Sequence, residues 1–123
     1  MKFKTLIATA AVAISGFAAS SAIAAEKAPT EVTIKGTEGD YYGYVKSPDS
    51  DCESDRKVNV YKMLGQSPDR QTDLKIGSDI AQPNGPDGMW SIGNSGYKKG
   101  KFYAHAPRTT ECKGDLSPVI TRN

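Results

Sequence analysis

Short runs in which apolar and polar residues alternate fill the chain from residue 31 onward, and each run is bounded by Gly, Pro, Asn, Asp or Ser. No run keeps an apolar period of 3.6 over a dozen residues, so we expect no substantial helix. Alternation with a period of two is typical of short strands with one face buried. We expect seven strands, at Glu31–Lys35, Tyr41–Lys46, Arg56–Leu64, Leu74–Ala81, Met89–Gly93, Lys101–Ala106 and Ser117–Thr121.

The parity of each run predicts which side chains face a core, because successive strand residues point to opposite faces. The predicted inward residues are Val32, Ile34, Tyr41, Val45, Val58, Val60, Trp90, Ile92, Phe102, Ala104 and Ala106. The same parity places Leu74, Ile76, Ser78 and Ile80 on one common face. Seven short strands at this spacing favour an all-β, two-sheet antiparallel sandwich.

The first residues have the three parts of a secretory signal peptide. Lys2 and Lys4 form a positive start, an apolar run follows, and Ala22-Ile23-Ala24 gives a cleavage motif, with a cut after Ala25 as an alternative. The apolar run is shorter than the roughly 20 residues of a membrane span. We therefore expect a signal peptide at 1–25, a single β-sandwich domain at 26–123, and no stable membrane insertion after cleavage.

Removing this segment changes the charge balance. The chain has 16 Lys and Arg residues against 14 Asp and Glu, and two of the lysines lie in the predicted signal peptide, which leaves 14 against 14. A neutral mature chain argues against nucleic-acid binding, which requires a clustered basic excess. The acidic residues gather between Glu38 and Asp55, whereas basic residues gather in the chain around Cys112. We interpret these as two solvated loop ends of opposite sign.

The two cysteines, Cys52 and Cys112, have only one intramolecular pairing. An exported chain matures where disulfides persist. A metal site would need a denser set of soft ligands, and the carboxylates around Cys52 disfavour a reactive thiolate. We therefore expect a Cys52–Cys112 disulfide, no cofactor, and a secreted or periplasmic location.

The order of several short motifs resembles a known class of module. Gly43-Tyr44-Val45 is followed by Cys52 before RKVNVYK, then by KIGSD, DGMWSIG, GKFYAHA and the late Cys112. This order resembles bacterial carboxypeptidase-regulatory-like and transthyretin-like sandwich modules, over nearly all of the predicted mature chain. The resemblance implies a transthyretin- or immunoglobulin-like sandwich. Hydroxyisourate hydrolases, which look like transthyretin, rely on several histidines and a C-terminal Y-R-G-S motif; this chain has one histidine and ends VITRN.

Two further motifs could carry chemistry. The serine of GNSG, Ser95, has a flank like that of a protease nucleophile, but the motif does not match G-x-S-x-G and fits a hairpin loop better. His105 is expected to be a solvated residue on an outward strand face. The loop that holds Asp49, Asp51, Glu53 and Asp55 has the clustered carboxylates of a weak calcium site, although the EF-hand pattern fails. We favour a solvated acidic loop that pairs with Arg56 and Lys57.

Tyrosines offer the remaining candidate site. Tyr42, Tyr44, Tyr61 and Tyr103 all fall on predicted outward faces, and would form one platform for a sugar or an extended peptide if their strands share a sheet. The leading hypothesis is an exported, non-catalytic binding or accessory module of the cell envelope or secretome, with a carbohydrate, peptide or cell-surface ligand. The alternatives are a structural envelope-stabilising protein without a ligand, or a small hydrolase.

Overall fold

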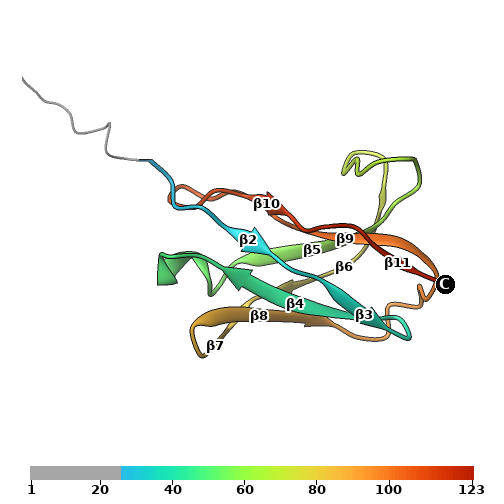
Figure 1. Ribbon diagram of the computed structural model, residues 1–123, viewed down its shortest axis with the longest axis horizontal. Helices are drawn as coiled ribbons and strands as arrows, with labels where there is room; N and C mark the ends of the chain where they lie inside the picture. Colours follow the sequence, from blue (N-terminus) through green and yellow to red (C-terminus); the bar gives the residue numbers. More distant parts are fainter. Residues whose placement is uncertain (1–25) are drawn as a thin grey trace, which may run out of the picture.

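The computed structural model describes residues 26–123, so the predicted signal peptide lies outside the described residues. This part of the chain contains strands and a single short 3-10 helix, η1 (Ser50–Cys52), with no α-helix (Figure 1). No helix within it is long and apolar enough to cross a bilayer. Ten strands are present: β2 (Glu31–Val32), β3 (Lys35–Thr37), β4 (Asp40–Lys46), β5 (Lys57–Lys62), β6 (Leu74–Ile80), β7 (Gln82–Asn84), β8 (Asp87–Ile92), β9 (Gly100–Ala106), β10 (Asp115–Leu116) and β11 (Ile120–Arg122).

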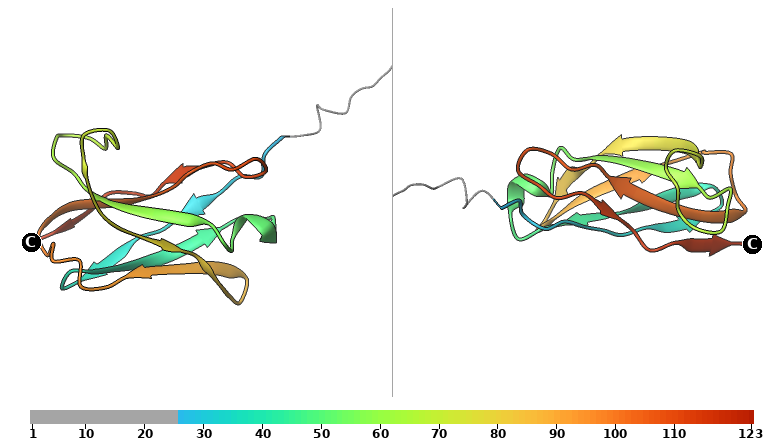
Figure 2. Two further views of the ribbon diagram at one scale, coloured as in Figure 1. Left: turned by 180° about the vertical axis from the view of Figure 1, so that it is seen from behind. Right: turned by 90° about the horizontal axis from the view of Figure 1, so that it is seen from above.

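The strands form two antiparallel sheets that face each other (Figure 2). The β5–β9 sheet has the order β10-β9-β5-β6, with β11 also paired to β9. The β4–β8 sheet has the order β2-β4-β8-β7, with β3 also paired to β4. The all-β, two-sheet prediction is therefore confirmed.

The core between the sheets is made by the residues that the alternation predicts. Tyr41, Val45 and Trp90 enter from the β4–β8 sheet, while Val58 and Phe102 enter from the other. The rings of Tyr41 and Phe102 lie 4.6 Å apart, centroid to centroid. Both sheets thus bury one face against the other, as parity requires.

The structure has ten strands where seven were expected. One expected strand is split into β2 and β3, and two short strands, β7 and β10, were not expected. The run from residue 31 is interrupted at Thr33, whose hydroxyl accepts a 2.8 Å hydrogen bond from the Tyr44 backbone. The carbonyl of Thr33 then lies where a Cβ on Gly43 would be. The two strands that alternation did not reveal, β7 and β10, are two or three residues long, too short to show a period.

The prediction that β6 alternates along its whole length is wrong. A register shift between Val60 and Tyr61 of β5 changes the parity of β6 opposite it. As a result Ile76 packs against the core, while Leu74 and Ile80 remain well exposed. A β-bulge has this effect because it adds one residue to one strand only.

Aspartates of the β5–β9 sheet close both sides of the sandwich. On one side, Asp79 accepts a 2.8 Å hydrogen bond from the backbone of Ser91 in β8. On the other side, Asp115 accepts a 2.8 Å hydrogen bond from the backbone of Val32 in β2. Each carboxylate satisfies a strand N–H of the opposite sheet, which would otherwise remain open at an edge.

The disulfide lies at one end of the sandwich, and the predicted pairing is confirmed. Cys52 in η1 and Cys112 in the β9–β10 loop are bonded, with 5.7 Å between their Cα atoms. The bridge links the connection between the two sheets to a loop of the β5–β9 sheet. The N-terminal segment joins the same end, since Ala28 donates to the Glu111 carbonyl and accepts from Lys113 N.

Arg56, predicted to pair with the acidic loop, is instead buried beside this disulfide. Its guanidinium donates to Thr30 Oγ1 at 3.1 Å and to the carbonyls of Cys52, Pro107 and Lys113 at 2.9, 3.0 and 3.0 Å. All four acceptors are neutral, so burial lowers the pKa of Arg56 below its ordinary value. The side chain joins the N-terminal segment, η1 and the β9–β10 loop.

Gly88 of β8 provides a test of how closely β8 approaches the backbone of Glu53, the residue that follows η1. The carbonyl of Glu53 occupies the place of a Cβ at this residue. We expect Gly88→Ala to lower the free energy of unfolding by about 2–3 kcal/mol, because backbone must move to admit the methyl group. Gly65→Ala is the matched control, since nothing lies within 4 Å of its Cβ position. Urea denaturation measures both; equal midpoints for the two variants would contradict this packing.

Candidate functional site

The four candidate tyrosines do not form one platform, because they lie in different sheets. Tyr42 and Tyr44 belong to β4 and lie half-buried on the outer face of the β4–β8 sheet. Tyr61 and Tyr103 belong to β5 and β9 of the other sheet. The condition on which the shared platform depended is therefore not met.

Tyr61 and Tyr103 form a small second core on the outer face of the β5–β9 sheet. They are opposite each other in the register of β5 and β9, and their rings stack at 5.3 Å between centroids. Met63 packs with them, and Tyr103 is fully buried although its strand parity is outward. The cover is the β5–β6 loop, residues 63–73, which stands over this face (Figure 1).

Asp73 fixes the end of this loop to the sheet. Its carboxylate accepts hydrogen bonds from Tyr103 Oη at 2.6 Å, from Asp69 N at 2.8 Å and from Leu64 N at 2.9 Å. Burial opposes ionisation of this carboxyl, but the three donors together outweigh it and lower the pKa of Asp73. Burial and the hydrogen bond to Asp73 raise the pKa of Tyr103 far above its usual value. The pair therefore exists as a neutral phenol donating to a carboxylate at ordinary pH.

A recess of about 520 Å³ lies between this loop and the sheet. We call it the loop recess; its lining is Tyr61, Ser67, Pro68, Asp69, Arg70, Gln71 and Leu116. Tyr61 lines the recess but is only 9 % exposed, and one face of its ring stacks on Tyr103. Hydroxyl, amide, carboxylate and guanidinium groups therefore surround a small aromatic surface.

The loop recess is bounded by Tyr61 on β5 and Leu116 on β10, so it spans the intervening strand β9. His105 of β9 is the register partner of both Leu116 and Asn59. The prediction that His105 is solvated is wrong, because it is only 9 % exposed. Burial, together with the positive charge of nearby Arg70, lowers the pKa of His105 to about 4, although Asp115 opposes the shift. The imidazole is thus neutral near pH 7.

Polar atoms beside the loop recess lack partners within residues 26–123. His105 Nδ1 and Asn59 Oδ1 are both buried without a hydrogen bond there. Buried polar groups in folded proteins are nearly always hydrogen-bonded, and unpaired ones are costly. The outer face of β5 and β9 therefore holds buried polar side chains at Asn59 and His105, whereas the opposite face of the same strands is apolar.

The four carboxylates of the candidate calcium loop do not converge on one point. Asp49 caps η1 by accepting from Asp51 N at 2.9 Å, and Glu53 accepts from Ser47 N at 3.2 Å. Asp51 and Asp55 are exposed. Among residues 26–123, no group of three or more His, Cys, Asp or Glu side chains is placed to hold a metal ion.

The serine of the GNSG motif stabilises the β8–β9 loop. Ser95 Oγ donates to the Gly39 carbonyl at 2.6 Å and accepts from Tyr97 N at 3.1 Å. His105 lies near the end of β9, whereas Ser95 precedes that strand, so β9 separates the two residues. A loop is therefore confirmed, but the prediction of a hairpin is wrong, because β8 and β9 belong to different sheets and this loop connects them.

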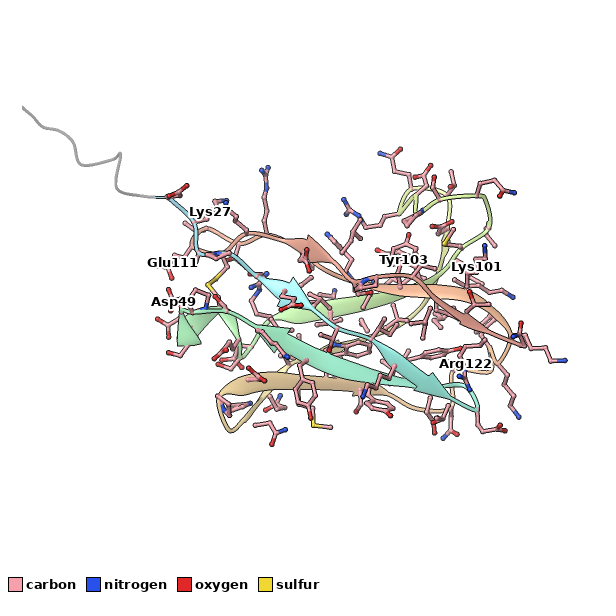
Figure 3. The ribbon with its side chains drawn as sticks, viewed as in Figure 1. Lys27, Asp49, Lys101, Tyr103, Glu111 and Arg122 are labelled. Carbon is pink, nitrogen blue, oxygen red and sulfur yellow. A yellow bond between two sulfur atoms is a disulfide. The ribbon has the colours of Figure 1, made fainter. Side chains whose placement is uncertain are left out.

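The basic residues around Cys112 in the sequence do not form one patch. Lys98 and Lys99 come just before β9 and Lys101 is its second residue, whereas Arg108 and Lys113 follow the end of β9, in the loop that holds Cys112. Figure 3 shows Lys101 and Arg122 at one end of the molecule, with Asp49 and Glu111 at the other. Lys27 is also at the disulfide end, so that end carries both signs of charge.

Sequence reasoning did not single out Arg70, Gln71 or Asp73. The available indication was the eleven-residue separation of β5 and β6, which is long for a hairpin connection. Asp69 is typical of turns, and its side chain accepts from Gln71 N at 3.0 Å. The fold of the loop onto the sheet depends on a contact with Tyr103, thirty residues away from Asp73.

Comparison with known proteins returns no match to any family model, any curated protein or any solved structure. The likeness to carboxypeptidase-regulatory-like and transthyretin-like modules therefore stays a prediction from the motifs.

Proposed function

We propose that this protein is an exported, non-catalytic binding module that recognises a saccharide in the loop recess. The observation that carries the proposal is the loop itself: Asp73 accepts one hydrogen bond from Tyr103 of the β5–β9 sheet and two from backbone groups within the loop. A loop fixed in this way forms a recess before any ligand arrives, and preorganisation reduces the entropic cost of binding.

The chemistry of the recess favours a saccharide. Tyr61 supplies a small aromatic surface, and Arg70, Gln71 and Ser67 supply hydrogen-bonding groups around it. A sugar has apolar C–H faces and many hydroxyls, which fits a concave site with a few convergent polar groups. The buried, neutral His105 lies under the recess but has no nucleophile or carboxylate hydrogen-bonded to it within residues 26–123, so we assign it no catalytic role.

The disulfide supports the cellular part of the proposal. Such a bond indicates an oxidising, extracytoplasmic environment. Together with the predicted signal peptide at 1–25, this favours a secreted or periplasmic protein of the cell envelope.

The proposal is tested by binding to a glycan array, followed by titration calorimetry with any glycan retained. We expect the variant with Arg70→Ala and Gln71→Ala to lose about tenfold or more in affinity, because both side chains line the recess. The control carries Arg108→Ala and Thr110→Ala, which removes the same charge from an exposed loop at the disulfide end.

The proposal is supported if the recess variant binds the glycan more weakly and the control variant binds it as the wild type does. Absence of any retained glycan, or equal affinity in both variants, contradicts it, and the first of these results favours a structural role without a ligand. Turnover in a screen of ester and peptide substrates would contradict the non-catalytic assignment.

A further inference from the structure

A groove lies along the side of the sandwich where β2 and β3 of one sheet face β10 and β11 of the other. Asp115 closes one half of this side through its hydrogen bond to Val32 N. The other half, between β3 and β11, is a groove of about 480 Å³. The two strands lie on the same side of the molecule (Figure 1). We call it the β3–β11 groove; it is separate from the loop recess, which lies on the outer face of the β5–β9 sheet.

Backbone groups of both strands are directed into this groove. A two-residue turn with positive φ at Glu38 and Gly39 joins β3 to β4, and such a turn is flanked by a hydrogen-bonded pair. That pair is Thr37 with Asp40, so the next residue, Gly36, is in a non-bonded pair and turns its N–H and C=O away from β4.

The same alternation holds on the opposite wall. Lys101 of β9 uses its carbonyl to accept from Met63 N, so its backbone is turned away from β11. Thr121 is the register partner of Lys101, and therefore turns its own N–H and C=O toward the groove. Within residues 26–123, no backbone hydrogen bond joins Gly36 to Thr121 or connects either to a loop.

The side chains of the groove combine apolar and positive character. Ile34 and Ile120 form the apolar part, next to the main core, and Tyr42 also lines the groove. Lys35 and Arg122 are its charged residues, and no carboxylate lines it. Arg122 lies at the end of the molecule where Lys101 is also found (Figure 3).

We propose that the β3–β11 groove binds an extended acidic peptide segment of a partner protein. Exposed strand edges bind extended peptides through main-chain hydrogen bonds, while pockets select alternate side chains. The groove offers such edges at Gly36 and Thr121, a contact surface for apolar side chains, and two cations for a carboxylate. A saccharide can satisfy the cations only if it is acidic, and it lacks the repeating amide groups that match a strand edge.

The experiment uses a short, capped, fluorescein-labelled peptide of alternating valine and glutamate, with fluorescence anisotropy as the measurement. We expect binding that weakens with added salt, because two charged contacts form. The variant with Lys35→Glu and Arg122→Glu should bind about tenfold or more weakly, since it reverses both charges. The control, Arg108→Glu with Lys113→Glu, reverses two exposed charges at the disulfide end and should bind as the unaltered protein does.

A second arm separates strand pairing from simple charge attraction. Amide N-methylation of the peptide should abolish binding, and the unmodified peptide should shift the amide resonances of Gly36 and Thr121 in the wild-type protein. Equal binding of the N-methylated peptide, displacement by inorganic phosphate or by a uronic acid oligomer at the peptide's own concentration, or shifts confined to other residues would overturn the proposal. Saccharide binding in the loop recess should be unaffected by the Lys35 and Arg122 substitutions, so the two proposals fail independently.

Discussion

Removal of the disulfide, by Cys52→Ala together with Cys112→Ala, lowers the free energy of unfolding by about 4 kcal/mol. The bridge closes a loop across a sequence separation of 60 residues. In the chain-entropy model, opening such a loop frees that much conformational entropy in the unfolded state. Both cysteines are buried, so the loss of two sulfur atoms adds a small packing term. Urea denaturation of the variant against the oxidised wild type measures the difference.

Reduced wild-type protein is the control, since it has the same packing atoms without the cross-link. It should lose nearly as much stability as the double variant. If both samples lose less than about 1 kcal/mol of unfolding free energy, the disulfide does little to restrict the unfolded chain. A large loss in the variant alone would assign the effect to packing and not to the cross-link.

Replacement of Arg56 by methionine lowers the free energy of unfolding by about 3 kcal/mol. The guanidinium donates to three backbone carbonyls, of Cys52, Pro107 and Lys113, and to one threonine hydroxyl. Methionine keeps much of the volume but leaves the three carbonyls unpaired, at about 1 kcal/mol each. Chemical denaturation at neutral pH measures the loss.

Arg56→Lys should be intermediate, because one ammonium group cannot reach all of the acceptors that the planar guanidinium joins. Arg108→Met is the surface control and should be neutral, since Arg108 is exposed in the same region. Methionine at position 56 with wild-type stability would mean that the buried charge costs as much as its hydrogen bonds contribute, as buried ionic groups sometimes do.

The parity of apolar residues predicted the core well, for a local reason. Val58 and Val60, or Phe102 and Ala104, alternate with polar residues, and a strand can bury only one of its faces against the opposite sheet. The disulfide was equally predictable, because two cysteines allow one pairing. The number of strands was not, since β7 and β10 are shorter than one full period of alternation.

The environment of outward residues could not be predicted from parity. Tyr103 and His105 were correctly placed on the outer face of β9, yet both are buried. The β5–β6 loop contributes the cover of Tyr103, and its position depends on the hydrogen bond between Asp73 and Tyr103. Local sequence shows a long polar connection but not the direction in which it folds. The same limit applies to Arg56, whose acceptors come from three separate segments.

The position of the disulfide also determines how the module would respond to tension. The described chain enters at the disulfide end and leaves at the opposite end of the sandwich (Figure 1). A pulling force applied through residues 26 and 123 passes through the covalent link between Cys52 and Cys112. The backbone between Cys52 and Cys112 therefore cannot be extended by the force. At about 3.4 Å per residue, this shortens the maximum extension by about 200 Å. With the disulfide formed, only the segments before Cys52 and after Cys112 can be pulled out. The module would therefore extend little under tension.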